Sequence, residues 1–504
     1  MSIRRNIAAS FVGQFYQLAI RLFMTPVYLA LMGPEGYGLV GIYILFIGVI
    51  QLFNVGLNAS MLREIARMRG GATGAVLVRR RLFHLSVVLC IIAGTFVFVV
   101  VVAAPVIATR WLSNVTLPHN EVVACLRLLS AAAAINFVTR LYSAGLLGLD
   151  EQIRLNTLGV ATATLRFVGV FIVLRFISGR PIAFSLFQVA AGGIEIIVTI
   201  VIFYRCLPTA EPKGAPVEEA SPVGFHRFAT GLAFLDIVWV AMLQIDRIVL
   251  SKALPLVDFA FFTVTVTAAS GVILLFAPIM QTLQPRFAAL VARGQLEELR
   301  ALYFKASHGV AALSFSAGAV LATFPRELVY SWTGNAAAAD WAVHVLPLYA
   351  IGNACVGVGS LPFLLQFALG KIRLHIIGHA ILAVIYFPSV IILGLAWGGF
   401  GTGLVWLIAN VAFLAMWVPF IHAQLLPALH SRWLLRHILL PVVSASVVVF
   451  LEQLLPFPAN RLSGGITLVV FGSVALGVSI LTSAAYRHEI FSRIAALLHR
   501  QSAQ

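Results

Sequence analysis

Arginine side chains interrupt several of the long apolar segments in this 504-residue chain. Arg21, Arg140 and Arg166 lie well inside such segments, away from the polar loops at either end. A guanidinium group stays charged at physiological pH and binds phosphate oxygens through paired hydrogen bonds. Three of them facing lipid chains would cost roughly 7–10 kcal/mol, so we expect them to face water or a polar partner. The pattern predicts a cationic cavity that suits an anionic ligand such as a phosphate or pyrophosphate.

Neutral polar side chains accompany these arginines at helical spacing. Gln14, Gln17 and Arg21 follow one another at intervals of three and four residues, which places them on one face of a helix. Such a face in an apolar helix either lines water or packs by hydrogen bonds against neighbouring helices. For the glutamine side chains the spacing does not decide between these two possibilities. The candidate cavity residues are Arg21, Arg140, Arg166, Arg247, Gln14, Gln17, Asn54 and Asn58.

Few acidic side chains lie in the apolar segments. Glu195, Asp236 and Asp246 are candidates to bind a coupling proton or cation, and an ion pair with a nearby arginine is the alternative for each of them. The four cysteines have no metal-binding or redox spacing, and the histidines do not cluster along the sequence. We therefore expect no metal site and no cofactor.

The composition identifies the elements that must hold these residues. Apolar residues make up 61% of the chain and charged residues only 10%, against about 25% charged in soluble proteins. With a mean hydropathy of +1.00, a water-soluble fold of this size is excluded. A bilayer needs about 20 apolar residues per helix, so we expect an all-α integral membrane protein with about 14 transmembrane helices. The predicted spans are 6–31, 39–62, 82–107, 122–147, 155–177, 182–204, 228–250, 259–283, 305–325, 342–369, 374–396, 400–422, 437–455 and 464–486.

The basic residues predict how these helices are oriented. With the N-terminus in the cytoplasm, 22 Lys and Arg residues fall in cytoplasmic loops and five in outer loops. This asymmetry follows the positive-inside rule and predicts that both termini are cytoplasmic. The net charge of +16 is then mostly a topology signal that faces anionic lipid, and it does not indicate a nucleic-acid partner.

The two sides of the polar stretch at 205–227 resemble each other. Arg69-Gly70 precedes Arg293-Gly294 by 224 residues, and a shared Ile-Arg-Leu recurs with a shift of 219. One half is thus about 220 residues and six helices, a parallel repeat of the kind found in some transporters, whose substrate sites lie between the halves. The expected organisation is an N-lobe at 1–204, a cytoplasmic linker at 205–227, a C-lobe at 228–425, and helices 13 and 14 with a cytoplasmic tail at 426–504.

Several short motifs, in their order and spacing, resemble the Wzx-type polysaccharide and O-antigen flippases of the multidrug/oligosaccharidyl-lipid/polysaccharide exporter superfamily. None of them is a sharp catalytic signature, but they run along most of the chain. The branch of the superfamily that moves the peptidoglycan precursor is similar in fold, but its phenylalanine- and asparagine-rich signature after the first helix is not seen here. The matching motifs are GPEGYGLVGIY (33–43), NVGLNASMLREIA (54–66), GLDEQIRLN (148–156), MLQIDRIVLSKALPLVDFAFF (242–262), LQPRFAALVARGQLEELRALY (283–303), ALGKIRLH (368–375) and GGFGTGL (398–404).

The resemblance implies a V-shaped pair of six-helix lobes that alternates between inward-open and outward-open states. Its cargo would be an undecaprenyl-pyrophosphate-linked oligosaccharide, moved from the inner to the outer leaflet of the bacterial cytoplasmic (inner) membrane for O-antigen lipopolysaccharide, capsule or exopolysaccharide synthesis. The last two helices, within 437–486, would form a hydrophobic groove for the polyprenyl tail. The implied partners are membrane lipids and the polysaccharide polymerase and chain-length proteins. The family's cationic lumen maps onto Arg21, Arg140 and Arg166 by their depth in the spans.

Two other functions remain as alternatives. A cation-coupled antiporter for drugs or small molecules would share the fold, but the surplus of arginine argues against it because such a lumen favours acids. A membrane polysaccharide polymerase or ligase would need a sizeable outer loop with acid and base residues, and no predicted outer loop exceeds about 17 residues. The absence of a G-x-x-x-x-G-K-[ST] sequence argues against a self-contained ATPase. We therefore expect a transporter and not an enzyme.

Overall fold

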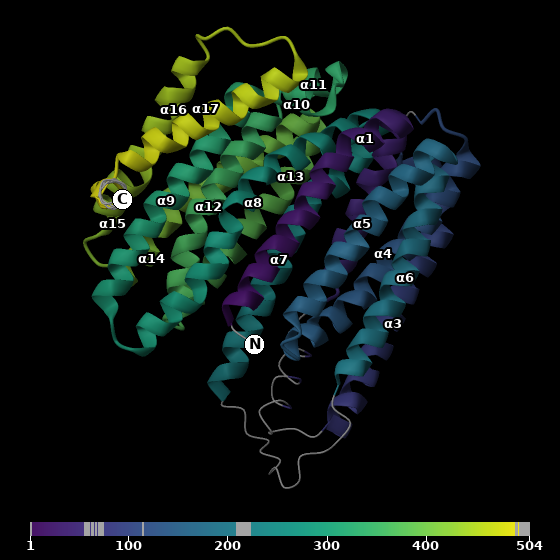
Figure 1. Ribbon diagram of the computed structural model, residues 1–504, viewed down its shortest axis with the longest axis horizontal. Helices are drawn as coiled ribbons and strands as arrows, with labels where there is room; N and C mark the ends of the chain where they lie inside the picture. The colour runs from purple at the N-terminus through teal and green to yellow at the C-terminus, as the bar shows by residue number, and fades with distance from the viewer. Residues whose placement is uncertain are drawn as a thin grey trace, which may run out of the picture. The chain divides into compact units, whose positions relative to one another are not determined.

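The computed structural model describes residues 3–54, 75–112, 115–207 and 223–488, together with Met61, Ile65, Met68 and Ser492. These residues are almost entirely helical (Figure 1). The long helices are α1 (Ile3–Gln51), α3 (Ala75–Val106), α4 (His119–Gly148), α5 (Gln152–Phe176), α6 (Pro181–Cys206), α7 (Val223–Ala253), α8 (Leu256–Ala292), α9 (Leu296–Thr323), α12 (Leu346–Ala368), α13 (Arg373–Ala412), α16 (Leu440–Glu452) and α17 (Arg461–Leu481). The shorter segments are α10 (Pro325–Thr333), α11 (Ala336–Ala342), α14 (Val418–Leu425), α15 (His430–Arg432) and the π-helical turns η1 (Ile107–Trp111), η2 (Phe413–Trp417) and η3 (Trp433–Leu439).

Eleven helices among the described residues are long and apolar enough to cross a membrane. Two of these spans, Phe15–Gln51 and Arg373–Leu425, each contain a non-helical glycine and cover two predicted spans. The helix α7, which the sequence also predicts as a span, has 31 residues. Each of the 14 predicted segments thus coincides with a helix, and the prediction of an all-α membrane protein is confirmed.

Several predicted helix ends differ from the observed ones, among them the end of α8, which is at Ala292 and not at 283. The helix α9 begins at Leu296 and not at 305, because Glu297 and Glu298 in its first turn stabilise a helix N-terminus. The predicted span 39–62 is helical as far as Gln51 and then turns, and its residues 55–60 and 62 lie outside the described part of the chain.

Two glycines with positive φ break the long helices α1 and α13. Gly33 has φ 72° and Gly398 has φ 57°, values that residues with a Cβ rarely adopt. Each is the first residue of a motif that carried the family resemblance, GPEGYG and GGFGTG. Close packing adds a second constraint after the α13 break, because a Cβ on Gly401 would lie 2.0 Å from the backbone oxygen of Leu393. These motifs therefore mark the points where the chain passes from one span to the next.

Replacing Gly398 by alanine is expected to destabilise the protein by about 1–3 kcal/mol, because alanine must adopt a strained backbone conformation there. The midpoint of thermal unfolding of the detergent-purified protein measures this loss. Gly477→Ala is the matched control, since nothing lies within 4 Å of an added Cβ in that part of α17 and its φ is not positive. Equal midpoints for the two variants would contradict the role of Gly398 as an obligatory break.

The chain forms two compact units, residues 1–263 and 264–504. In the first unit the core lies between α3, α4 and α6, around Phe137, Leu141 and Phe203. In the second unit a core around Phe287 and Tyr303 joins α8 and α9 to α12 and η3. The helix α7 and the start of α8 belong to the first unit, so the units do not follow the predicted lobes, whose boundaries stay a prediction.

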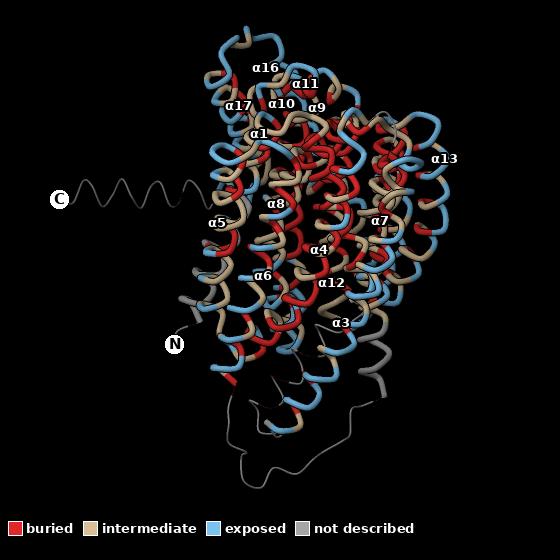
Figure 2. Tube along the Cα trace, turned by 90° about the vertical axis from the view of Figure 1, so that its right-hand side faces the viewer, coloured by how far each residue is buried: buried red, intermediate tan, exposed pale blue. Residues whose placement is uncertain are grey.

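Large apolar residues are exposed on α3 and α13, two helices with stretches coloured as exposed in Figure 2. Phe98 on α3 is 68% exposed and Val384 on α13 is 75% exposed. Extended apolar surface of this kind is typical of a protein that contacts membrane lipid.

The same turn recurs at equivalent places in the two units. After α4 it is centred on Asp150 (φ 63°), and after α12 on Gly370 (φ 67°). In both turns that residue's N–H bonds to the carbonyl three residues earlier (3.0 and 3.1 Å), and the next N–H bonds to the carbonyl five residues earlier (3.1 and 2.8 Å). This helix-ending geometry satisfies the last carbonyl groups of both helices. The matched turns support the internal repeat that the shared Ile-Arg-Leu predicted.

Candidate functional site

The first half of α1 packs along α5. The hydroxyl oxygens of Tyr16 and Thr164 lie 2.7 Å apart, and the Tyr28 hydroxyl donates to the backbone oxygen of Phe167 at 2.8 Å. Gln17 packs against the same helix, since a Cβ on Gly159 would lie 2.6 Å from its Nε2. Helix packing thus accounts for Gln17, and its assignment to a cavity stays a prediction.

Arg166 is the centre of a polar network that joins α5 to α6 and α1. Its Nε donates to Glu195 Oε2 at 2.7 Å, and its Nη2 lies 2.7 Å from the same oxygen. Its Nη1 donates to Tyr43 Oη and to Gln188 Oε1, both at 3.1 Å. The Arg166 and Glu195 side chains are only 13% and 18% exposed. Of the two alternatives for Glu195, the structure has the ion pair.

Arg140 is an exposed side chain on α4. Its Nε donates to Asn136 Oδ1, one turn earlier, at 3.3 Å. Glu195 lies within electrostatic range, but no described carboxylate lies within 4.0 Å of the Arg140 guanidinium. Because Glu195 is already paired with Arg166, these three groups together keep one surplus positive charge.

Arg21 on α1 and Arg247 on α7 bring two guanidinium groups within electrostatic range of each other. The Arg21 side chain is exposed. Arg247 Nη1 donates to the backbone oxygen of Leu243 at 3.1 Å, while its buried Nε has no hydrogen-bond partner. Among the described residues neither group has a carboxylate within 4.0 Å. Like charges in this arrangement repel each other, and a bound anion removes that repulsion.

Buried amide atoms without hydrogen-bond partners lie on or next to the same two helices. They are Gln51 Nε2 at the end of α1, Asn54 Oδ1 just beyond it, and Gln244 Oε1 on α7. Gln244 packs onto the α1 backbone, where a Cβ on Gly48 would lie 2.1 Å from its Cδ. An unsatisfied buried amide costs about 1–3 kcal/mol.

Sequence reasoning selected part of this surface. It placed Asn54 and Arg247 in the site, and it put Gln51 on the polar face of Asn54 and Gln244 on that of Arg247 without including either in the site. It also missed Tyr43 and Gln188, which no sequence pattern connects to Arg166. The described contacts bring Arg21 near Arg247 and Arg140 near the Arg166 pair.

Several predicted site residues do not join these contacts. Asn58 and the Gln14 side chain lie outside the described part of the chain. Asp236 is exposed on α7, and the buried Asp246 accepts a hydrogen bond from the Arg247 backbone N–H at 2.6 Å. Within the described residues no group of three His, Cys, Asp or Glu side chains is arranged to hold a metal ion.

Histidines that are separate in the sequence form close pairs in the second unit. His422 Nδ1 lies 2.9 Å from His430 Nδ1, and its Nε2 lies 2.7 Å from Tyr303 Oη. The rings of His375 and His379 are 4.2 Å apart. The spacing of four residues between His375 and His379 was a signal for that pair, whereas Tyr303 is 119 residues from His422 in the sequence.

Comparison with solved structures places this fold among known transporters. A lipid II flippase MurJ in an inward closed conformation superposes with a TM-score of 0.68 at 15% identity, over 95% of this chain and 99% of that one. An inward-facing multidrug resistance MATE family transporter of the MOP superfamily gives 0.59 at 15% identity, over 81% and 95%. A mutant form of the Vibrio cholerae MATE transporter VcmN gives 0.54 at 15% identity, over 85% and 98%. At these identities the likeness establishes the fold alone.

The sequence comparisons give the family. No curated protein sequence matches the chain. The family model described as "Polysaccharide biosynthesis protein" matches residues 3–291, which is more than half of the chain. This membrane protein therefore has the fold of the MurJ and MATE transporters and belongs to the polysaccharide biosynthesis protein family.

Proposed function

We propose that the protein is a flippase for a polyprenyl-pyrophosphate-linked oligosaccharide, which it moves from the inner to the outer leaflet of the bacterial inner membrane. The observation that carries the proposal is the proximity of Arg21 and Arg247 with no described carboxylate paired to either. A pyrophosphate group carries the negative charge that this arrangement lacks. Membership of the polysaccharide biosynthesis family supports a lipid-linked glycan as the cargo.

In the proposed mechanism the first unit supplies the contacts to the head group. Arg21 and Arg247 bind the pyrophosphate, and Arg140 adds positive charge to the cationic surface. The buried amides of Gln51 and Gln244 hydrogen-bond to sugar hydroxyls only after the conformational change exposes them, while the polyprenyl tail stays in the bilayer. Alternating access between inward-open and outward-open states then exposes the bound head group to the other side. No bond of the cargo is formed or broken.

The orientation rests on the distribution of basic residues. The 22-to-5 ratio of Lys and Arg between the two sets of loops supports cytoplasmic termini and cargo loading from the cytoplasmic side. The polymerase and chain-length proteins that act on the flipped product are the proposed partners. Coupling to a proton or cation through Asp236 or Asp246 belongs to the same proposal. For Glu195 the ion pair with Arg166 supports a structural role instead.

Reconstitution tests the proposal directly. Purified protein in vesicles is expected to move a fluorescent undecaprenyl-pyrophosphate oligosaccharide between leaflets many times faster than protein-free vesicles do. A membrane-impermeant quencher reports the fraction in the outer leaflet, and an organic cation dye serves as the competing cargo. If the lipid-linked sugar moves at the protein-free rate while the dye is transported, the protein is a drug antiporter and the proposal fails.

A further inference from the structure

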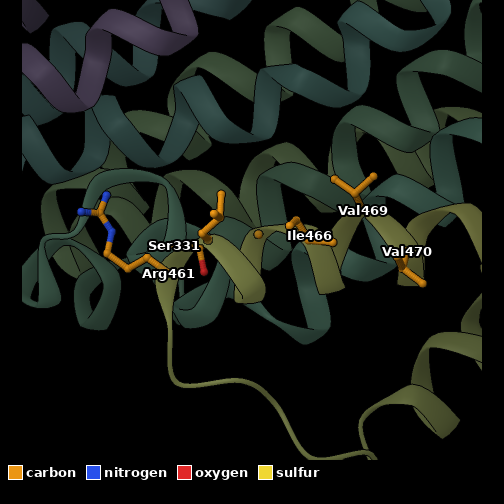
Figure 3. A pocket seen from close by; sticks show the side chains of 7 residues that line it. Ser331, Arg461, Ile466, Val469 and Val470 are labelled. Carbon is orange, nitrogen blue, oxygen red and sulfur yellow. The ribbon is translucent and has the colours of Figure 1, made fainter.

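A groove on the second unit combines a fixed cation with an apolar surface. It lies between α10 and α17, has a volume of about 540 Å³, and is lined at one end by Arg461 and Ser331 (Figure 3). Beyond them the lining consists of apolar residues of α17, among them Ile466, Val469 and Val470. The volume falls within the range of roughly 300–1,000 Å³ that is typical of small-molecule sites.

Contacts with the end of α10 hold the Arg461 guanidinium in place. Its Nη2 donates to the backbone oxygen of Trp332 at 3.2 Å. The guanidinium also lies against Gly334, where a Cβ would be 2.4 Å from Nη1. Gly334 follows α10 with φ +71°, a left-handed conformation that favours glycine at a helix end. A side chain at this position would also collide with the Arg461 guanidinium. The cation is therefore positioned beside the groove before any ligand binds.

The charge of Arg461 has no acidic partner among the described residues. No carboxylate lies within 4.0 Å of its guanidinium. Arg326, at the start of the same helix α10, differs in this respect. Its Nε donates to Asp340 Oδ1 at 2.6 Å, and this hydrogen bond raises the pKa of Arg326. Of these two arginines, only Arg461 stands beside the apolar groove and retains an unbalanced charge.

The length of the apolar lining fits one leaflet of a bilayer. Arg461 and Val470 are nine residues apart on α17, which corresponds to about 14 Å along the helix axis. Half of the hydrocarbon core of a bilayer is about 15 Å thick. Ile466 and Val469 are 57% and 69% exposed, so this face of a membrane-spanning helix is open to lipid. The lining is therefore long enough for one acyl chain of a ligand whose anion sits at Arg461.

We propose that this groove binds an acidic phospholipid, with the phosphate at Arg461 and Ser331 and an acyl chain along Ile466, Val469 and Val470. Both acidic and zwitterionic phospholipids carry this phosphate, and the selectivity comes from net charge, because the headgroup ammonium of a zwitterionic lipid is repelled by the unbalanced charge of Arg461. The apolar lining favours a phospholipid over free phosphate, because only the phospholipid has an acyl chain to bury against it. The site lies wholly in the second unit and does not depend on the cargo that the first unit binds.

Native mass spectrometry of the full-length protein, titrated with phosphatidylglycerol or phosphatidylcholine, tests the site. Wild-type protein is expected to bind phosphatidylglycerol more tightly, and Arg461→Gln is expected to weaken that binding about tenfold or more. Gly465→Phe fills the groove while leaving the arginine intact, and an added Cβ there meets nothing within 4 Å. It is expected to cause a similar loss. Arg326→Gln removes a charge from the same end of the unit and is expected to leave lipid binding unchanged.

Three results would overturn the proposal. Wild-type protein that binds the two phospholipids equally would exclude an acidic-lipid site. Unchanged phosphatidylglycerol binding in both Arg461→Gln and Gly465→Phe would exclude this groove. Tighter binding of undecaprenyl phosphate than of phosphatidylglycerol, lost in the same variants, would assign the groove to an isoprenoid lipid. Because no flipping is measured, these outcomes are independent of the transport assay.

Discussion

Arg21→Gln is expected to lower the rate of polysaccharide export about 10- to 100-fold, which corresponds to the loss of one charge-assisted hydrogen bond to the cargo. Arg21→Glu is expected to abolish export, because a carboxylate at this position repels the pyrophosphate and attracts Arg247 instead. The same pair of substitutions at Arg140 is expected to give a smaller loss, since Glu195 already lies within range of that guanidinium. Surface polysaccharide in a complemented deletion strain measures the effect.

A control substitution at Arg175 distinguishes the effect of changing the protein's charge from the effect of changing it at Arg21. Arg175 is exposed on the last turn of α5, where a basic side chain reaches the membrane interface. Arg175→Glu makes the same change of charge and is expected to leave export nearly unchanged. Membrane levels of all the variants must match that of the wild type. Normal export with Arg21→Glu would remove the cationic site from the mechanism, whatever the cargo is.

Breaking the Arg166–Glu195 pair is expected to have the largest effect on stability. Removing one partner of a buried ion pair leaves an uncompensated charge and costs about 3–5 kcal/mol. Arg166→Met and Glu195→Leu are therefore each expected to melt well below the wild type in detergent. The double variant replaces the pair by apolar side chains of similar size and is expected to recover most of the loss, because no charge then remains buried.

The same variants decide what Glu195 does. A structural pair predicts that the double variant regains both stability and some export. If Glu195→Leu unfolds at the same temperature as the wild type yet loses export, then Glu195 is an ion-coupling residue and its ion pair with Arg166 does not stabilise the fold. Tyr43 and Gln188, which also bond to Arg166, limit the recovery because the double variant leaves both without that partner.

The sequence located most of the helices because the membrane imposes their length and composition. A segment such as 182–204 needs no tertiary information, since only an apolar helix satisfies its backbone within lipid. Boundaries were less certain where no lipid constraint acts, as at the start of α9, where Glu297 and Glu298 extend the helix beyond the apolar segment. The motifs at Gly33 and Gly398 were recognised as a family resemblance, while their role as breaks in α1 and α13 came from the backbone angles.

The assignment of the site residues stays a prediction, and the structure adds which of their charges are paired. Deep arginines were identified because their energetic cost in lipid is large at any rotation of the helix. An arginine is neutralised only where a neighbouring helix places a carboxylate beside it. Helix packing determines those contacts, and the sequence alone does not give them. Arg166 meets Glu195 across 29 residues and Tyr43 across 123, whereas Arg21 lies near Arg247 without a described acidic partner.

The amino-acid sequence by itself therefore determined an all-helical membrane protein with surplus positive charge in its apolar segments, because hydropathy and charge are properties of each segment alone. The tertiary structure decided which charges are balanced, which glycines interrupt helices, and where Arg461 stands beside an apolar groove. These features depend on distances between segments far apart in the chain, and only the folded arrangement fixes those distances.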